Sequence, residues 1–169
     1  MRTMIKLLPA LALLLGCGGG AETADREASA AANQPATADT ATDAGLTWGP
    51  SPPGLPAGAQ VAVVSGDPTK AGPFTIRVDM PPDYAVRPHH HPTSEELRLV
   101  EGTLHLGHGP KWNQPAMKSM ATSEPVTLAP KEPHSLHAAS RVVLEVQGTG
   151  PFAITYVDPK DDPRTTSTP

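Results

Sequence analysis

Hydrophobic and polar positions alternate along much of the chain between residues 46 and 163. Phe74, Ile76 and Val78 fall on one face of an extended strand, and Val142, Leu144 and Val146 repeat the pattern later. Helical periodicity is almost absent, and proline or glycine interrupts the chain every 8–12 residues or so, as between the short strands of sandwiches and barrels. The pattern therefore predicts an all-β domain.

The expected strands are short runs separated by turn residues. They are Gln60–Ser65, Phe74–Met80, Tyr84–Pro88, Leu97–Val100, Thr103–Leu106, Val126–Leu128, His134–Ala138, Arg141–Gln147 and Phe152–Val157. Turns are expected at Gly66-Asp67-Pro68 and at Glu101-Gly102. Gly107–Glu124 has little strand signal, and we expect either a long loop over the mouth of the domain or a structural plug.

The chain begins with a signal-like segment. Arg2 and Lys6 precede an apolar run, Leu7–Leu15, which is too short to span a bilayer because a span needs about 20 apolar residues. The run ends in Leu14-Leu15-Gly16-Cys17, which resembles the lipobox of bacterial lipoproteins. That resemblance implies cleavage of residues 1–16, lipid attachment at Cys17, and a place in the bacterial cell envelope, on the outer membrane facing the periplasm if the cell has two membranes. The alternatives are an ordinary signal peptide with an incidental cysteine, or a buried helix.

The regions flanking the expected domain differ from it in composition. Residues 17–45 are rich in alanine, threonine and glycine and have no large apolar residue between Gly18 and Asp43. Such a segment buries too little surface to offset its ordering entropy, so we expect a disordered tether before a domain at 46–163. Residues 164–169 are expected to form a disordered tail.

Charge and cysteine content exclude some classes of function. The formal net charge is −4, loss of residues 1–16 would make it more negative, and no basic cluster is present. A nucleic-acid partner is therefore not expected. Cys17 is the only cysteine, so no disulfide forms within the chain.

The stretch Pro88–Gly102 carries the strongest chemical signal. His89 and His91 share one face of a strand, and His90 points to the other. Glu95 follows four residues after His91, far enough for the chain to turn and bring a carboxylate to the same point. Two imidazoles and a carboxylate suit one divalent transition metal: iron, manganese, zinc, nickel or copper. The alternative is a solvated histidine tract.

This stretch resembles the first motif of the cupin superfamily, His-x-His, three or four residues, Glu, six residues, Gly. His89, His91, Glu95 and Gly102 match it, while Asp83 stands in place of the leading glycine. The second cupin motif is degenerate. Pro130 fits, but Glu124 and Glu132 replace glycines, His134 arrives one residue early, and Ala138 stands at the asparagine position.

The resemblance implies a jelly-roll fold, the cupin double-stranded β-helix. It also implies a fourth metal ligand from the second motif, for which His134 is the first choice and His137 the second. The pieces Gly66–Pro68, Gly72–Phe74, Gly150–Tyr156 and Asp161–Arg164 are similar to those of small single-domain cupins. Cupins often pair through their sheets, so a homodimer is expected.

Three functional classes follow. Four protein ligands leave two metal positions open for a small-molecule substrate, which favours a metal-dependent oxidoreductase of the dioxygenase kind, or an isomerase or hydrolase with a non-redox metal. The alternative is a binding or sensing module for a metal or small ligand, without turnover. The third class is a fold retained for structure with no metal.

Other polar residues are weaker candidates. Glu96 and Glu101 are expected in solvent. Arg98 and Tyr84 either line the cavity, where they would bind an anionic or aromatic substrate, or have ordinary surface and core roles. His105 and His108 flank a strand end and are either exposed or part of a pocket. No serine, threonine or cysteine lies in a recognisable nucleophile motif.

Overall fold

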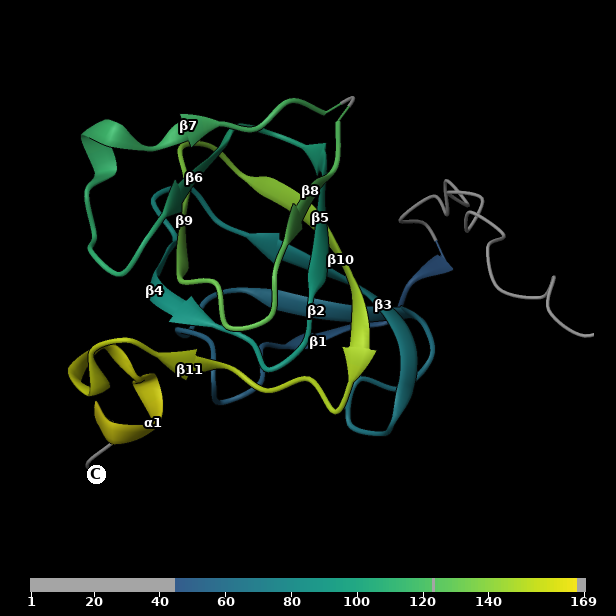
Figure 1. Cartoon of the computed structure of the whole chain (residues 1–169). Coiled ribbons are helices and arrows are strands. Elements are labelled where there is room, and N and C mark those ends of the chain that lie inside the picture. The colour runs from purple at the N-terminus through teal and green to yellow at the C-terminus, as the bar shows by residue number, and fades with distance from the viewer. Residues whose placement is uncertain (1–44, 123, 167–169) are drawn as a thin grey trace, which may run out of the picture. The chain divides into compact units, whose positions relative to one another are not determined.

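The computed structural model describes residues 45–122 and 124–166. In this part of the chain the strands form two antiparallel sheets that face each other (Figure 1). The first sheet has the order β1-β2-β3-β10-β5-β8 and the second the order β11-β4-β9-β6-β7. The predicted all-β jelly roll is confirmed. In the described residues the strands pair as two separate sheets, so the jelly roll does not close into one continuous barrel.

Most strands match the expected runs, but the expected run Phe152–Val157 forms a strand only at Thr155–Tyr156. Their bounds are β1 Trp48–Pro50, β2 Gln60–Ser65, β3 Gly72–Met80, β4 Ala85–His90, β5 Glu95–Glu101, β6 Leu104–His108, β7 Lys118–Ser119, β8 Val126–Leu128, β9 His134–Ala138, β10 Val142–Gly150 and β11 Thr155–Tyr156. Only β1 and β7 were not predicted, because a strand of two or three residues is too short to show alternation. The described residues also contain three short helices. They are η2 Gln114–Ala116, between β6 and β7, and η3 Pro159–Asp161 and α1 Pro163–Thr166, after β11.

The apolar alternation forms the core between the sheets. Phe74, Ile76 and Val78 of β3 lie beside Gly148, Val146 and Leu144 of β10, and these apolar side chains are all buried. The alternate positions of the same strands include two charged residues, Arg77 and Glu145, that are also buried. Arg77 and Glu145 form an ion pair of 3.2 Å across β3 and β10. Around this ion pair, β3 and β10 are therefore buried on both faces.

Two turn positions require a left-handed backbone. Gly102 has φ of 92°, and a Cβ there would collide with the carbonyl oxygen of Arg141. Asp83, which replaces the leading glycine of the first cupin motif, has φ of 63°. Aspartate tolerates this conformation better than most residues, so the substitution preserves the turn.

The segment 107–124 does not cover the cavity described below. It forms η2 and then β7, which pairs with β6 through Ser119 and His105 at the edge of the second sheet. None of its described residues lines the cavity, and Met120 is buried in the core. The expectation of a loop over the mouth is therefore wrong.

The predicted signal segment, Cys17 and nearly all of the tether lie outside the described residues. Residues 164–166, expected at the start of a disordered tail, belong to α1, where Arg164 donates to Asp162 and to the carbonyl of Ile154. No helix within residues 45–122 and 124–166 is long and apolar enough to cross a membrane.

Candidate metal centre

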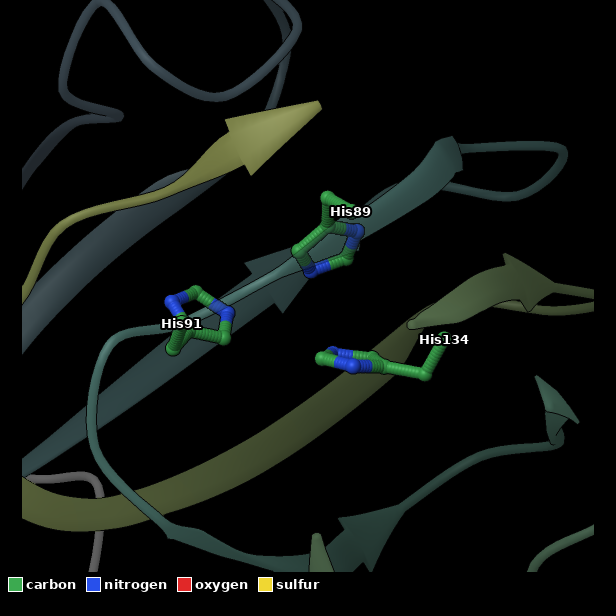
Figure 2. Close-up of side chains that lie close together, drawn as sticks. All are labelled: His89, His91 and His134. Atoms are coloured by element: carbon green, nitrogen blue, oxygen red, sulfur yellow. The ribbon is translucent and has the colours of Figure 1, made fainter. Parts of the chain in front are cut away.

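Three histidines converge between the sheets. His89 lies near the end of β4, His91 follows that strand, and His134 begins β9, and Figure 2 shows their rings pointing toward one another. One ring nitrogen from each lies within 4.8 Å of the others. All three residues are nearly inaccessible to solvent, with exposed fractions of 3%, 6% and 1%.

The pairing of β4 with β9 explains why His89 and His134 meet. They are direct cross-strand partners, and partners in an antiparallel ladder point to the same face. The register shifts between Val86 and His89, where β4 holds one residue more than β9. This β-bulge contains Pro88, which has no N–H to donate. Val86 already points inward, so the extra residue is what turns His89 inward as well.

Main-chain carbonyls fix how each ring presents its nitrogens. The Nδ1 atom of His89 lies 2.8 Å from the carbonyl oxygen of Arg87, that of His91 lies 2.8 Å from Ala153, and that of His134 lies 3.1 Å from Glu132. A carbonyl oxygen only accepts, so each Nδ1 carries the proton and donates it. In the neutral rings Nε2 is then left with a free lone pair, the arrangement found in metal-binding histidines.

Burial favours the neutral form of the His89 and His91 rings. It lowers the pKa of His89 well below the usual value, and the neighbouring His134 and His91 lower it further. Burial also lowers the pKa of His91, against the opposing effect of the Glu95 carboxylate. Metal ligation requires neutral imidazoles, so this environment favours the ligating form.

Glu95 brings a carboxylate from the opposite sheet against two of the three rings. Its Oε1 atom lies 3.0 Å from Nε2 of His134 and 3.5 Å from Nε2 of His91. The residue is 4% exposed, and Oε1 has no hydrogen-bond partner of acceptable geometry. A buried carboxylate facing nitrogen lone pairs is unfavourable unless a cation or proton lies between them. The three buried histidines therefore fit a transition metal, and the Glu95 carboxylate lies beside two of them.

The other candidates lie elsewhere. His137 is on the outer face of β9, where it stacks near His105 and lies edge-on to Trp112, so the structure brings His134 and not His137 to the cluster. His108 is exposed at the end of β6, and its Nδ1 lies 3.0 Å from the carboxylate of Glu132. His90 is half-buried and carries a buried Nδ1 without a hydrogen-bond partner.

The remaining polar candidates divide in the same way. Glu96 and Arg98 lie 3.5 Å apart, and neither lines the cavity. Glu101 is exposed and pairs with Arg141. Tyr84 does line the cavity, and its hydroxyl donates to the carbonyl of Pro56.

The degenerate second motif has a backbone explanation. In the second cupin motif, Glu132 stands at the position of a glycine. The left-handed residue in this structure is instead its neighbour Lys131, with φ of 60°. This one-residue shift agrees with the early position of His134. The Lys131 N–H donates to the carbonyl of His91, so the turn also connects the two parts of the cluster.

A cavity of about 310 Å³ lies beside the cluster. Both sheets contribute to its lining, together with residues 52–55, 152–154 and Arg164. Phe152 stacks on His91 with ring centroids 4.2 Å apart and planes at 9°. Sequence reasoning missed the contribution of Phe152 and of residues 52–55, because neither stands near a motif.

Comparisons with known proteins support the fold. No protein-family model matches the sequence, and no curated protein matches it in sequence. Among solved structures, the polyketide cyclase RemF from Streptomyces resistomycificus superposes with a TM-score of 0.52 at 18% identity, over 66% of this chain and 80% of that one.

Two further structures are similar. A protein of Methylibium petroleiphilum PM1, inferred to be an acetylacetone dioxygenase, has a TM-score of 0.54 at 18% identity, over 70% of this chain and 79% of that one. A cupin-2 domain from Rhodospirillum rubrum has a TM-score of 0.53 at 12% identity, over 69% of this chain and 78% of that one. At these identities the likeness concerns the fold alone.

Proposed function

We propose that this chain, which has the cupin jelly-roll fold, is a metal-dependent cupin acting on a small organic molecule, with oxidoreductase chemistry of the dioxygenase kind. The observation that carries the proposal is the set of three buried imidazoles whose Nδ1 protons are donated to carbonyls, which leaves three Nε2 lone pairs facing one point. By analogy with the polyketide cyclase and the inferred dioxygenase that share this fold, we take the substrate to be a small organic molecule.

The chain's own groups would have distinct tasks. His89, His91 and His134 would hold the metal through Nε2, and Glu95 would add a negatively charged oxygen. A redox-active metal held there would support oxygen chemistry, and zinc would instead polarise a carbonyl. The apolar cavity would exclude water from the reacting end of the substrate.

Metal analysis tests the proposal. The protein is purified without a histidine tag from unsupplemented medium, and about one equivalent of iron, manganese, nickel, copper or zinc is expected. His134→Ala should lose the metal. His137→Ala is the matched control, since it removes the same side chain from the outer face of the same strand, and it should retain the metal.

Two results would contradict this assignment. A folded protein with no metal ends the metal-dependent proposal. If His134→Ala retains the metal and His137→Ala loses it, then the ligand from β9 is His137 and not His134. With a redox metal present, oxygen uptake in the presence of small organic molecules then tests the oxidoreductase step.

A binding or sensing module is the second candidate. It is favoured because the hydroxyl of Tyr84, which lines the cavity, already donates to the carbonyl of Pro56. Apart from the four donor residues, no uncommitted acid or base therefore stands out among the described lining residues. Bound metal without oxygen uptake or product formation would favour this module.

We also propose that Cys17 is lipidated and anchors the domain in the bacterial cell envelope. The support is the signal-like sequence up to Leu14-Leu15-Gly16-Cys17. Cells expressing the chain with an alkyne-labelled fatty acid should yield labelled protein in the membrane fraction. Cys17→Ser should abolish the label, and a labelled Cys17→Ser protein would disprove the assignment.

A further inference from the structure

The polar atoms of the cavity are concentrated at one place. Ring nitrogens of the three histidines lie within 4.8 Å of one another, and Oε1 of Glu95, 3.0 Å from Nε2 of His134, is buried without a hydrogen-bond partner. The other polar groups of the lining are engaged. The hydroxyl of Tyr84 is bound to Pro56, and each histidine Nδ1 is bound to a carbonyl.

The rest of the cavity wall is aliphatic or aromatic. It consists mainly of Leu55, Val61, Ile76, Val78, Met80, Val86, Leu97, Leu136, Leu144, Val146, Phe152 and Ile154. These side chains come from both sheets, so a ligand there would have apolar contacts on opposite sides. A buried polar group on the ligand would find no partner against this wall, and such burial is costly.

The wall also lacks a free positive charge. Arg164 is the cationic side chain among the described lining residues, and its guanidinium lies 2.6 Å from Asp162 while also donating to the carbonyl of Ile154. An anionic group distant from the metal centre would therefore gain little from it.

The volume sets the size of the ligand. An apolar cavity of about 150 Å³ holds benzene. The cavity here is about 310 Å³, room for an apolar body of about two fused rings.

From these observations we infer that the cavity takes a compact, apolar molecule with a single polar donor group at the end facing the histidines. Sugars and dicarboxylic acids are excluded, because their several polar groups would be buried against aliphatic side chains. This inference rests on the proposed function in placing that donor group at the metal centre, but the preference for an apolar body belongs to the cavity itself.

Three probes with one ring system test the inference. Naphthalene has the body alone, 2-naphthol adds one donor, and naphthalene-2,6-dicarboxylate carries a charge at each end. Binding to the chelator-treated protein is measured by calorimetry or by probe fluorescence. Naphthalene and 2-naphthol should bind, and the dicarboxylate should bind at least about tenfold more weakly than 2-naphthol.

A matched pair of variants locates the binding. Val61 and Val63 both lie on β2, but Val61 lines the cavity and Val63 is 50% exposed. Val61→Phe fills part of the cavity and should weaken 2-naphthol binding at least about tenfold. Val63→Phe should leave it unchanged.

The outcomes separate the inference from the proposed function. Three results would overturn the inference. The first is that neither naphthalene nor 2-naphthol binds, and the second is that the dicarboxylate binds as tightly as 2-naphthol. The third is that Val61→Phe and Val63→Phe bind 2-naphthol with equal affinity. Metal content is measured separately on the untreated protein. A metal-free protein that still selects the apolar probes would contradict the proposed function and leave the cavity preference standing.

Discussion

We expect Glu95 to have opposite effects on metal binding and on the stability of the metal-free protein. Its carboxylate is buried, and Oε1 faces Nε2 of His134 at 3.0 Å without a hydrogen bond of acceptable geometry. Burying a charge in this way destabilises the metal-free fold, whereas the same charge strengthens the binding of a cation. A glutamate at this position would therefore lower the stability of the metal-free protein while strengthening the binding of a cation.

Glu95→Gln separates the two effects. The neutral amide removes the buried charge and has N–H groups to donate toward the imidazoles, so the metal-free variant should be more stable by about 1–2 kcal/mol. Its metal affinity should fall by about 10–100-fold. Chemical denaturation of the chelator-treated protein and metal titration measure these two quantities.

Glu96→Gln is the control for this substitution. Glu96 is the next residue, is partly exposed, and pairs with Arg98 instead of facing the histidines. It should change neither quantity by more than about 0.5 kcal/mol. A Glu95→Gln protein that binds metal as tightly as the wild type would remove Glu95 from the donor set.

At the scale of single elements, β4 shows how a small irregularity sets the direction of a functional side chain. The extra residue between Val86 and His89 allows both to point into the interior, although they are three residues apart. Regular alternation would have placed them on opposite faces. The bulge therefore connects the apolar wall of the cavity to the cluster of histidines.

The turn between β5 and β6 depends on Gly102. Gly102→Ala introduces both a left-handed backbone strain and a collision of Cβ with the carbonyl of Arg141. The expected loss of stability is about 2–4 kcal/mol by denaturant unfolding.

Gly109→Ala is the matched control for the collision. Gly109 has a similar φ of 97°, but a Cβ there would meet no atom within 4 Å. Its cost should be about 1–2 kcal/mol, from strain alone. Equal losses in the two variants would show that the main chain at Arg141 moves away freely.

On the scale of the whole domain, two tyrosines connect the segment 51–56 to the second sheet. Tyr84 precedes β4 and donates to the carbonyl of Pro56, and Tyr156 of β11 donates to that of Gly54 at 2.9 Å. Both tyrosines are buried. The segment they hold lines the cavity through Pro52, Gly54 and Leu55, so these bonds help to define its shape.

Alkaline titration tests this connection. Burial raises the pKa of Tyr156 to about 12 from the usual 10.0, with a further contribution from Asp162, and burial also raises the pKa of Tyr84. Because the unfolded chain loses these protons first, the stabilisation is complete below about pH 10 and is lost as the pH rises through about 12.

The measurement is the ultraviolet absorbance of tyrosinate, recorded together with a fold-sensitive signal. The chain has two tyrosines, so the titration reports on these groups alone. In denaturant both should ionise near pH 10, and in the folded protein they should ionise at higher pH, together with unfolding. Ionisation of the folded protein near pH 10 would show that the hydroxyls are not held as described.

The sequence by itself determined the all-β class and most strand positions, because alternation is a local property with a period of two residues. It also indicated the composition of the donor set, since His89, His91 and Glu95 stand close together along the chain. The turn residues Gly102 and Asp83 were predictable for the same reason, as their backbone preferences do not depend on distant contacts.

Only the tertiary structure decided which later histidine joins that group. His134 and His137 lie on the same short strand, and the choice depends on the pairing of β9 with β4 and on the bulge at Pro88. The apolar cavity, the ring of Phe152 on His91 and the tyrosine bonds to residues 54 and 56 also join distant parts of the chain. Such contacts follow from how the sheets pack, and no local pattern in the sequence encodes them.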